Sequence, residues 1–424
     1  MMYCARLNIG WLLRNIITKG IMSSKFEELP VEMMLEIFQY IDAYDLYHGF
    51  YDLTARLNLV INTADIKLHM IDYIHPEIFD YYCSNIISRF KHCLSYLRVP
   101  SDKLEKFLKL FNLNEFVSLR ALILCEPKQL DDERMILEKL SKLKQLKYLS
   151  LNGDKYLIQL NTIDYSLISL QYLNIDCCKI KTFLFILQII PNIKHIRCSL
   201  RLSVPHEQYE SIGKYVPKLI SLKFKSYYIN FDTILLLLSN LLELKKLSFA
   251  AHSFDCYNGY KWSQLLSTLP LLKKFQFFID ATVAFEDSID DVIQSWNILS
   301  QWNIQINYSN VFICVYTLPF SQLCWFTTCL YNMKTLTFGD QNKIMLNDND
   351  NIQQLFIRLT NDHKILARYS NVQSVYFYFE SNLPVSLPST FLEDLSKTFQ
   401  LSTVQSLGIT YNRVENSITK ESKR

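Results

Sequence analysis

A six-residue pattern, L-x-x-L-x-L, recurs along this chain, with another apolar residue sometimes standing in for leucine. The first eight intervals between starts are 23 to 28 residues long, and the last three are 32 to 39 residues long. The copies are Leu94-Leu97-Val99, Leu119-Leu122-Leu124, Leu146-Leu149-Leu151, Leu170-Leu173-Ile175, Ile193-Ile196-Cys198, Leu219-Leu222-Phe224, Leu244-Leu247-Phe249, Leu272-Phe275-Phe277, a weaker Leu299-Trp302-Ile304, Met333-Leu336-Phe338, Val372-Val375-Phe377 and Val404-Leu407-Ile409. A unit of this length cannot bury its own apolar face, so the units must stack on one another.

Each copy predicts a short strand, and an apolar stretch such as TFLFILQII at 182–190 predicts a helix that covers it. This pattern resembles the leucine-rich repeat. The resemblance implies an α/β fold over residues 93–415, a solenoid with a curved parallel sheet and helices on its convex side. The family usually has Asn or Cys eight residues after each start, and among the eleven stronger copies only Cys178 and Asn412 match. We therefore expect irregular loops, because the turn backbone needs other hydrogen-bond partners.

Residues 25–65 read as a separate helical module. Pro30 suits a helix start, and apolar residues at helical spacing follow it as far as Ile41. The run Leu29-Pro30-Val31-Glu32, then Leu35, Ile37-Phe38, Ile41-Asp42 and Asp45-Leu46, closely resembles the F-box, through which substrate receptors dock onto the Skp adaptor of cullin-based ubiquitin ligases. By position, the resemblance assigns adaptor binding to Leu29, Pro30, Glu32, Ile37, Phe38 and Leu46. The family's usual Trp in the third helix is replaced by Leu57.

The remaining segments are predicted from composition. Residues 1–24 form a basic tail without acids, which we expect to be disordered. The tail fits either a mitochondrial-type presequence or a loose extension before a second start at Met22, and we favour the extension. Residues 66–92 are predicted to be a helical linker and residues 416–424 a disordered tail. No window holds the 18 apolar residues that a membrane span needs, so no membrane partner is expected.

Glycine and cysteine usage excludes several classes of protein. The 8 glycines lie at least ten residues apart, which excludes the glycine-rich nucleotide-binding loops and the nucleophile elbow. The 11 cysteines form no CxxC pair, which favours a reducing compartment, cytoplasmic or nuclear. The 8 histidines form no metal-binding spacing. We therefore expect no catalytic residue, no metal and no cofactor.

Alternation along each strand predicts which residues point to the open, concave face of the sheet. In the middle units these residues are mostly basic, and tyrosines flank them. The predicted target-binding residues are Arg98, Tyr172, His195, Arg197, Lys223, Lys225, Lys246, Lys274, Tyr376 and Tyr378. Such a face suits an acidic or phosphorylated segment of a protein. It equally fits a solvated strand face, and the tyrosines would also suit stacking on single-stranded nucleic acid.

The F-box resemblance implies a substrate-recognition subunit of a Skp-cullin-F-box type ubiquitin ligase, with roles in protein binding and ubiquitin-dependent degradation, and the shape of the repeat array suits it to hold the target. The partners implied by the resemblance are a Skp-type adaptor, a cullin reached through it, and a target protein on the concave face. The net charge of +3 is too small to identify nucleic acid as the partner. The alternative is a repeat scaffold that binds protein or RNA without any ligase, its N-terminal helices capping the solenoid.

Overall fold

The computed structural model describes residues 26, 28–72, 74–125, 139–151, 166–201, 210–227, 229–252, 255–282, 288–308, 312–317, 326–329, 334–338, 354–359, 374–380 and 406–412. The predicted tails at 1–24 and 416–424 lie outside these residues. Two compact units divide the chain. The first comprises Met1–Tyr227, Asp232–Lys246 and Thr268–Lys273, and the second comprises Tyr228–Phe231, Leu247–Ser267 and Lys274–Arg424.

The first unit begins with three short helices. They are α3 (Val31–Phe38), α4 (Ala43–Gly49) and α5 (Ala55–Thr63). Asp42 caps α4 by accepting from the amide of Tyr44, and Thr54 caps α5 by accepting from the amide of Leu57. The sequence therefore folds locally into the three helices that its pattern predicts, and we call α3 to α5 the helical module.

The segment predicted as a helical linker contains a strand. Residues Ile66–His69 form β1, which pairs in parallel with β2 (Leu94–Val99). The prediction missed β1 because four residues with two apolar positions lack the L-x-x-L-x-L pattern. Helices occupy the rest of the segment: α6 (Pro76–Tyr81), the π-helix η1 (Tyr82–Ile87) and α7 (Ser88–Phe90). The sheet thus begins one strand earlier than expected, directly after the helical module.

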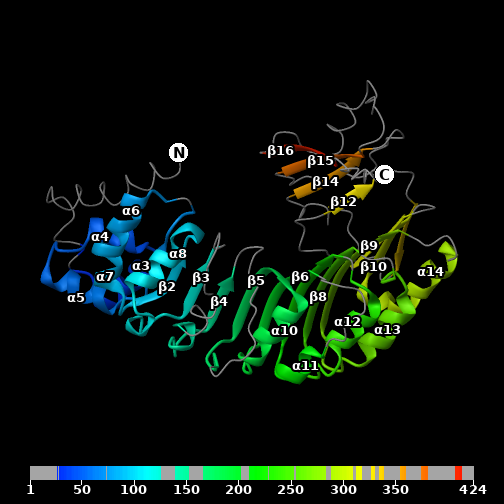
Figure 1. The fold of residues 1–424 in the computed structure, drawn as a ribbon, viewed down its shortest axis with the longest axis horizontal. Helices are drawn as coiled ribbons and strands as arrows, with labels where there is room; N and C mark the ends of the chain where they lie inside the picture. Colours follow the sequence, from blue (N-terminus) through cyan, green and yellow to red (C-terminus); the bar gives the residue numbers. More distant parts are fainter. Residues whose placement is uncertain are drawn as a thin grey trace, which may run out of the picture. The chain divides into compact units, whose positions relative to one another are not determined.

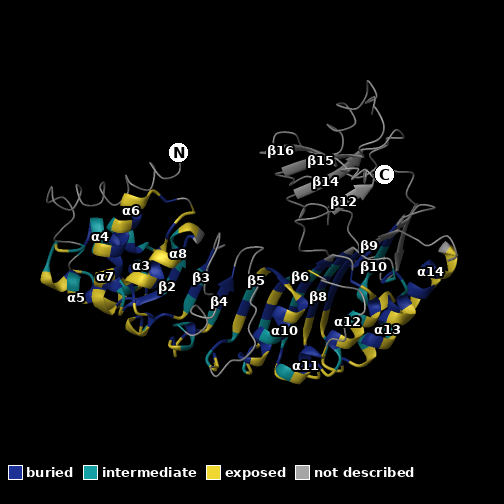
Figure 2. Cartoon of the chain, in the orientation of Figure 1, coloured by how far each residue is buried: buried dark blue, intermediate teal, exposed yellow. Residues whose placement is uncertain are grey.

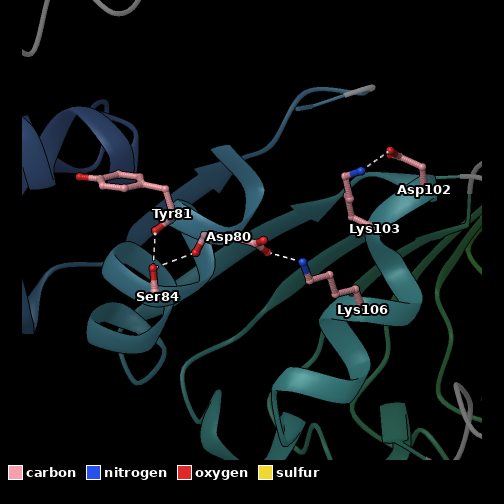
Figure 3. Close-up of polar contacts among 6 residues, drawn as sticks. All are labelled: Asp80, Tyr81, Ser84, Asp102, Lys103 and Lys106. Atoms are coloured by element: carbon pink, nitrogen blue, oxygen red, sulfur yellow. Dashed lines mark hydrogen bonds and ion pairs between the residues drawn. The ribbon is translucent and has the colours of Figure 1, made fainter. Parts of the chain in front are cut away.

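Side-chain contacts join these helices to the next repeat of the array (Figure 3). Lys106 of α8 (Leu104–Leu110) forms an ion pair with Asp80 of α6, with 2.5 Å between Nζ and Oδ1. At the start of the π-helix, the Ser84 hydroxyl donates to the carbonyl oxygen of Asp80 at 2.8 Å. The hydroxyl therefore satisfies a carbonyl where the helix changes its winding.

Parallel strands follow one another through the first unit. After β1 and β2 come β3 (Ala121–Leu124), β4 (Tyr148–Leu151), β5 (Tyr172–Lys179), β6 (His195–Arg201) and β7 (Ser221–Tyr227). The second apolar position of each copy stands beside its neighbour in register, in the row Leu97, Leu122, Leu149, Leu173, Ile196 and Leu222. These side chains are at most 3% exposed, so one continuous core runs across the strands (Figure 2).

Helices line one side of these strands (Figure 1). They include α10 (Ile180–Gln188), α11 (Ile212–Tyr215) and α12 (Phe231–Leu238). The apolar stretch at 182–190 forms most of α10, as predicted, and Phe183 and Leu187 of this helix are fully buried. The first unit therefore consists of parallel strands that alternate with helices, as the repeat pattern predicts.

The second unit departs from that arrangement. It contains the rest of β8 (Lys246–His252), α13 (Gly259–Ser267), β9 (Lys274–Thr282), α14 (Ile289–Ser295), the 3-10 helix η4 (Trp296–Trp302), β10 (Ile304–Tyr308), β11 (Phe312–Thr317) and β13 (Lys334–Phe338). Strand β11 is antiparallel to both β9 and β10, and β13 is antiparallel to β10. The expected parallel sheet is therefore wrong after β9, because β11 follows β10 after only three residues, too few for the crossover that parallel neighbours need.

The last described strands form a separate parallel sheet within the second unit. Its order is β12 (Phe326–Cys329), β14 (Gln354–Leu359), β15 (Ser374–Glu380) and β16 (Ser406–Asn412). The predicted strands at Val375 and Leu407 are present and stand opposite each other in register. The repeat pattern did not predict β12 or β14, so it identifies only part of this sheet.

Candidate functional site

The beginning of the helical module is accessible. Pro30 and Glu32 are exposed, and Leu29 is half-buried. The carbonyl oxygen of Leu29 accepts a hydrogen bond from Nη2 of Arg56 at 2.8 Å, which holds this turn against α5. Next to it, Met33 is 49% exposed. The predicted adaptor-binding end is thus an accessible surface that includes apolar side chains, and a hydrogen bond fixes its position on the module.

Two of the predicted adaptor-binding residues do not lie on that surface. Phe38 and Leu46 are fully buried, and the ring of Phe38 packs 5.4 Å from that of Phe50. Ile37 is half-buried. The prediction that Phe38 and Leu46 contact the adaptor is therefore corrected. These two side chains form the small core of the module itself.

The opposite side of the module is built onto the edge of the sheet. Asp42 forms an isolated parallel bridge with Lys67 of β1, and its carboxylate accepts a hydrogen bond from the amide of His69 at 2.8 Å. The same carboxylate accepts from the amide of Tyr44 at 3.0 Å. One side chain therefore caps a helix and covers a backbone amide of the edge strand, a role that the sequence analysis missed.

A row of ring-bearing side chains crosses the open face of the first unit. Tyr148, Tyr172 and His195 stand opposite one another on β4, β5 and β6. The rings of Tyr172 and His195 are stacked, with centroids 4.3 Å apart and planes within 8°. Ser221 continues the row on β7.

Lys246 extends this row at the first position of β8. The amides of Tyr172, His195, Ser221 and Lys246 donate in turn to the carbonyl oxygens just before the preceding strand, at 2.9 to 3.1 Å. These four residues therefore occupy equivalent positions in successive repeats. The Lys246 side chain is exposed.

Basic side chains follow two positions further along the strands. Asn174, Arg197 and Lys223 stand opposite one another, and Lys225 lies two residues beyond Lys223. Arg197 is exposed, and Lys223 and Lys225 are half-buried. Because residues two apart in a strand share a face, the ring row and these basic residues lie on the same face of the sheet.

Arg98 stands apart from the other predicted target-binding residues of the first unit. It lies on β2, with three strands between it and the β6 strand of Arg197, and its Nη2 pairs with the Asp72 carboxylate at 2.6 Å. Its Nε donates to Sγ of Cys125 at 3.3 Å. The sequence analysis missed this pairing because Asp72 follows β1, a strand that the pattern did not predict.

The remaining predicted residues belong to the second unit. Lys274 is the first residue of β9 and is exposed. Tyr376 and Tyr378 lie on β15, in register with Phe356 and Arg358 of β14. The side chains of both tyrosines lie outside what the structure describes. The structure thus brings together six of the ten predicted residues: Tyr172, His195, Arg197, Lys223, Lys225 and Lys246.

Burial and neighbouring charges both act on the titration of His195 on this face. The pKa of His195 is lowered by burial first, and then by the positive charges of Lys246 and Lys194. His195 is therefore biased toward its neutral form, in which the ring stacks on Tyr172.

The described thiols are buried in the body of the protein. Burial raises the pKa of Cys83 and of Cys93 to about 12, so these thiols stay protonated and unreactive at neutral pH. Among the side chains that the structure describes, no group of histidine, cysteine or acidic residues is arranged to hold a metal ion. No described helix is both long and apolar enough to cross a membrane.

Comparison with known proteins identifies no family for this chain. No family model and no curated protein matches the sequence. Among solved structures, the chain is similar to the leucine-rich repeat-containing protein LegL7 from Legionella pneumophila, with 13% identity and a TM-score of 0.29, over 59% of this chain and 93% of that chain. That score is too low to carry an argument. The strand registers of the chain itself show parallel strands that stand side by side through the first unit.

Proposed function

We propose that this chain is a non-catalytic binding scaffold and that it acts as the substrate-recognition subunit of a Skp-cullin-F-box type ubiquitin ligase. The helical module docks onto the Skp-type adaptor, and the open face of the sheet holds a target protein. The chain contributes proximity, because it raises the local concentration of target lysines beside the ubiquitin-carrying enzyme.

The observation that carries the ligase proposal is the accessibility of the Leu29–Glu32 turn at the start of the module. Val31 and Met33 are 40% and 49% exposed beside Pro30 and Glu32. A module of three short helices with apolar side chains left outside its own core supplies the kind of surface that another protein covers. The F-box resemblance begins at the same turn.

Co-purification with a Skp-type adaptor tests the ligase proposal. The double variant Leu29→Ala/Pro30→Ala is expected to lose the adaptor, because it removes the apolar side chains at the exposed end. Val117→Ala is the matched control, since Val117 is 61% exposed in a turn before β3, outside the module. Adaptor binding by the double variant at the level of wild type contradicts the F-box assignment.

The second candidate is a scaffold without a ligase, and the contacts of Asp42 favour it. They make the module a cap on the edge strand β1, and a solenoid needs such a cap whether or not an adaptor binds. In that case the module has a structural role only. Wild-type protein that is folded and yet fails to bind purified adaptor supports this second function.

A further inference from the structure

The strongest unassigned feature is the charged and aromatic part of the open face in the first unit. We call it the basic-aromatic patch. It consists of Tyr172, His195, Arg197, Lys223, Lys225 and Lys246.

The patch has two parallel parts with different chemistry. The ring row runs across the strands, while Arg197 and Lys223 form a basic row two positions further along. Neighbouring strands are about 4.8 Å apart, and residues two apart in a strand are separated by about 7 Å. A chain that crosses β5 to β8 thus meets rings on β5 and β6 and cations on β6, β7 and β8.

The aromatic part offers a stacking surface. The side chain of Tyr172 is 43% exposed although one face of its ring is covered by His195. A second aromatic side chain can therefore pack on the accessible part of the Tyr172 ring. The pairing with His195 restrains the tyrosine, which lowers the entropy lost on binding.

Two cations of the patch are not neutralised within the described part of the chain. Among the residues described, neither Arg197 nor Lys246 takes part in an ion pair. Asp176 of β5 is the nearby acid on the strands that form the patch. The lowered pKa of His195 is consistent with a positive local potential, since Lys246 and Lys194 are among its causes.

We propose that the basic-aromatic patch binds an extended acidic polypeptide segment that carries an aromatic residue. The aromatic side chain stacks on Tyr172, and carboxylates pair with Arg197, Lys223 and Lys246. This proposal rests on the proposed function as a binding scaffold and specifies the kind of target that it holds.

A polypeptide fits this patch better than single-stranded nucleic acid does. Nucleic-acid platforms stack successive bases on several rings, whereas here Tyr148 and Tyr172 are tilted by 34° with centroids 6.5 Å apart. The net charge of +3 is also low for binding a polyanionic backbone. One stacked ring beside a few cations matches an acidic segment with a single aromatic side chain.

Synthetic peptides provide the direct test on the full chain. The patch is about 14 Å across from β5 to β8, so a labelled peptide of about ten residues, rich in Asp and Glu with one central Tyr, is long enough to span it. Fluorescence anisotropy is expected to show saturable binding that weakens between about 0.05 M and about 0.5 M salt. The peptide with Ala in place of Tyr is expected to bind about tenfold more weakly to wild type.

Three variants separate the parts of the patch. Arg197→Glu/Lys246→Glu is expected to weaken binding of the Tyr peptide by at least about tenfold. Tyr172→Ala is expected to remove the difference between the Tyr and Ala peptides. Lys144→Glu/Lys218→Glu is the matched control, because it reverses two exposed lysines in turns outside the patch and is expected to bind as wild type does.

Any outcome of these binding experiments that differs from the expected ones overturns the proposal. Absence of peptide binding, or equal weakening by the control variant, rejects the patch as an acidic-segment site. Tighter binding of an oligouridine RNA that depends on Arg197 and Lys246 assigns the patch to nucleic acid instead. Adaptor co-purification from the same preparations reads out the ligase proposal separately, so that either idea can fail alone. Circular dichroism of every variant excludes unfolding as the cause.

Discussion

The Asp42 carboxylate accepts the backbone amide of His69 at 2.8 Å, which joins the helical module to the first strand of the sheet. The same side chain caps α4 through the amide of Tyr44. The module is therefore continuous with the array instead of being separated from it by a linker. In a ligase, this contact would fix the direction in which the first unit presents its open face.

Replacing Asp42 by Ala is expected to destabilise the first unit by about 1 to 3 kcal/mol, because it removes a helix cap and leaves an edge amide without its partner. Urea unfolding measures this change, and hydrogen exchange should show faster exchange at His69. Asp65→Ala is the matched control. Asp65 pairs with Arg120 at 3.1 Å on an exposed surface, so its loss should change stability by less than about 1 kcal/mol. Equal effects of the two substitutions would show that Asp42 has no special role.

The pH dependence of stability should report on His195. Its pKa is lowered from the ordinary 6.5, by burial first and by Lys246 and Lys194 next. The neutral form therefore stabilises the fold above about pH 6.5, and this contribution is lost as the pH falls toward the pKa of the folded state. Thermal unfolding between about pH 7.5 and about pH 5 is expected to show a smaller loss of Tm for His195→Gln than for wild type.

The titratable and charged groups near His195 provide a control for the pH dependence of thermal unfolding. They are Tyr172 and Asp176 on β5, Lys194 just before β6, Arg197 on β6, Lys223 on β7 and Lys246 on β8. Lys246→Gln should shift the histidine pKa upward, because it removes one of the charges that lower it. An NMR titration of the His195 ring measures this shift directly. A pKa unaffected by Lys246→Gln would contradict the electrostatic cause.

The repeat pattern predicted the first unit well, and the reason is physical. Leu97, Leu122 and Leu149 recur at a nearly constant interval and are buried in one row, so the sequence period fixes both the strands and their register. The pattern did not predict strand direction in the second unit. Alternation of apolar residues is the same in parallel and antiparallel strands. The sequence pattern therefore could not predict that β11 runs antiparallel to its neighbours.

The candidate site was predictable only in part. Alternation correctly put His195 and Arg197 on one face, since residues two apart in a strand share a side. Helical spacing did not reveal that Phe38 and Leu46 face inward, because an apolar side chain can fill either its own core or that of a partner. The pairing of Arg98 with Asp72 joins residues from separate strands, and no local pattern encodes it.

Gly213 marks a close approach between α11 and the turn that follows α12 in the first unit. A Cβ added at Gly213 would lie 2.5 Å from the backbone carbonyl oxygen of Asn240. Asn240 itself has a positive φ of 64°. Since both groups belong to the backbone, neither can rotate away, and Gly213→Ala is expected to destabilise the first unit by about 1 to 3 kcal/mol.

Chemical denaturation of Gly213→Ala measures this loss of stability. Lys214→Ala on the same helix is the control, because it removes only an exposed ion pair with Glu210, worth about 0.3 to 0.5 kcal/mol. Helix propensity alone would make Gly→Ala stabilising by up to about 1 kcal/mol, so the sign of the change separates the two causes. A Gly213→Ala protein more stable than wild type would mean that the turns can move apart freely.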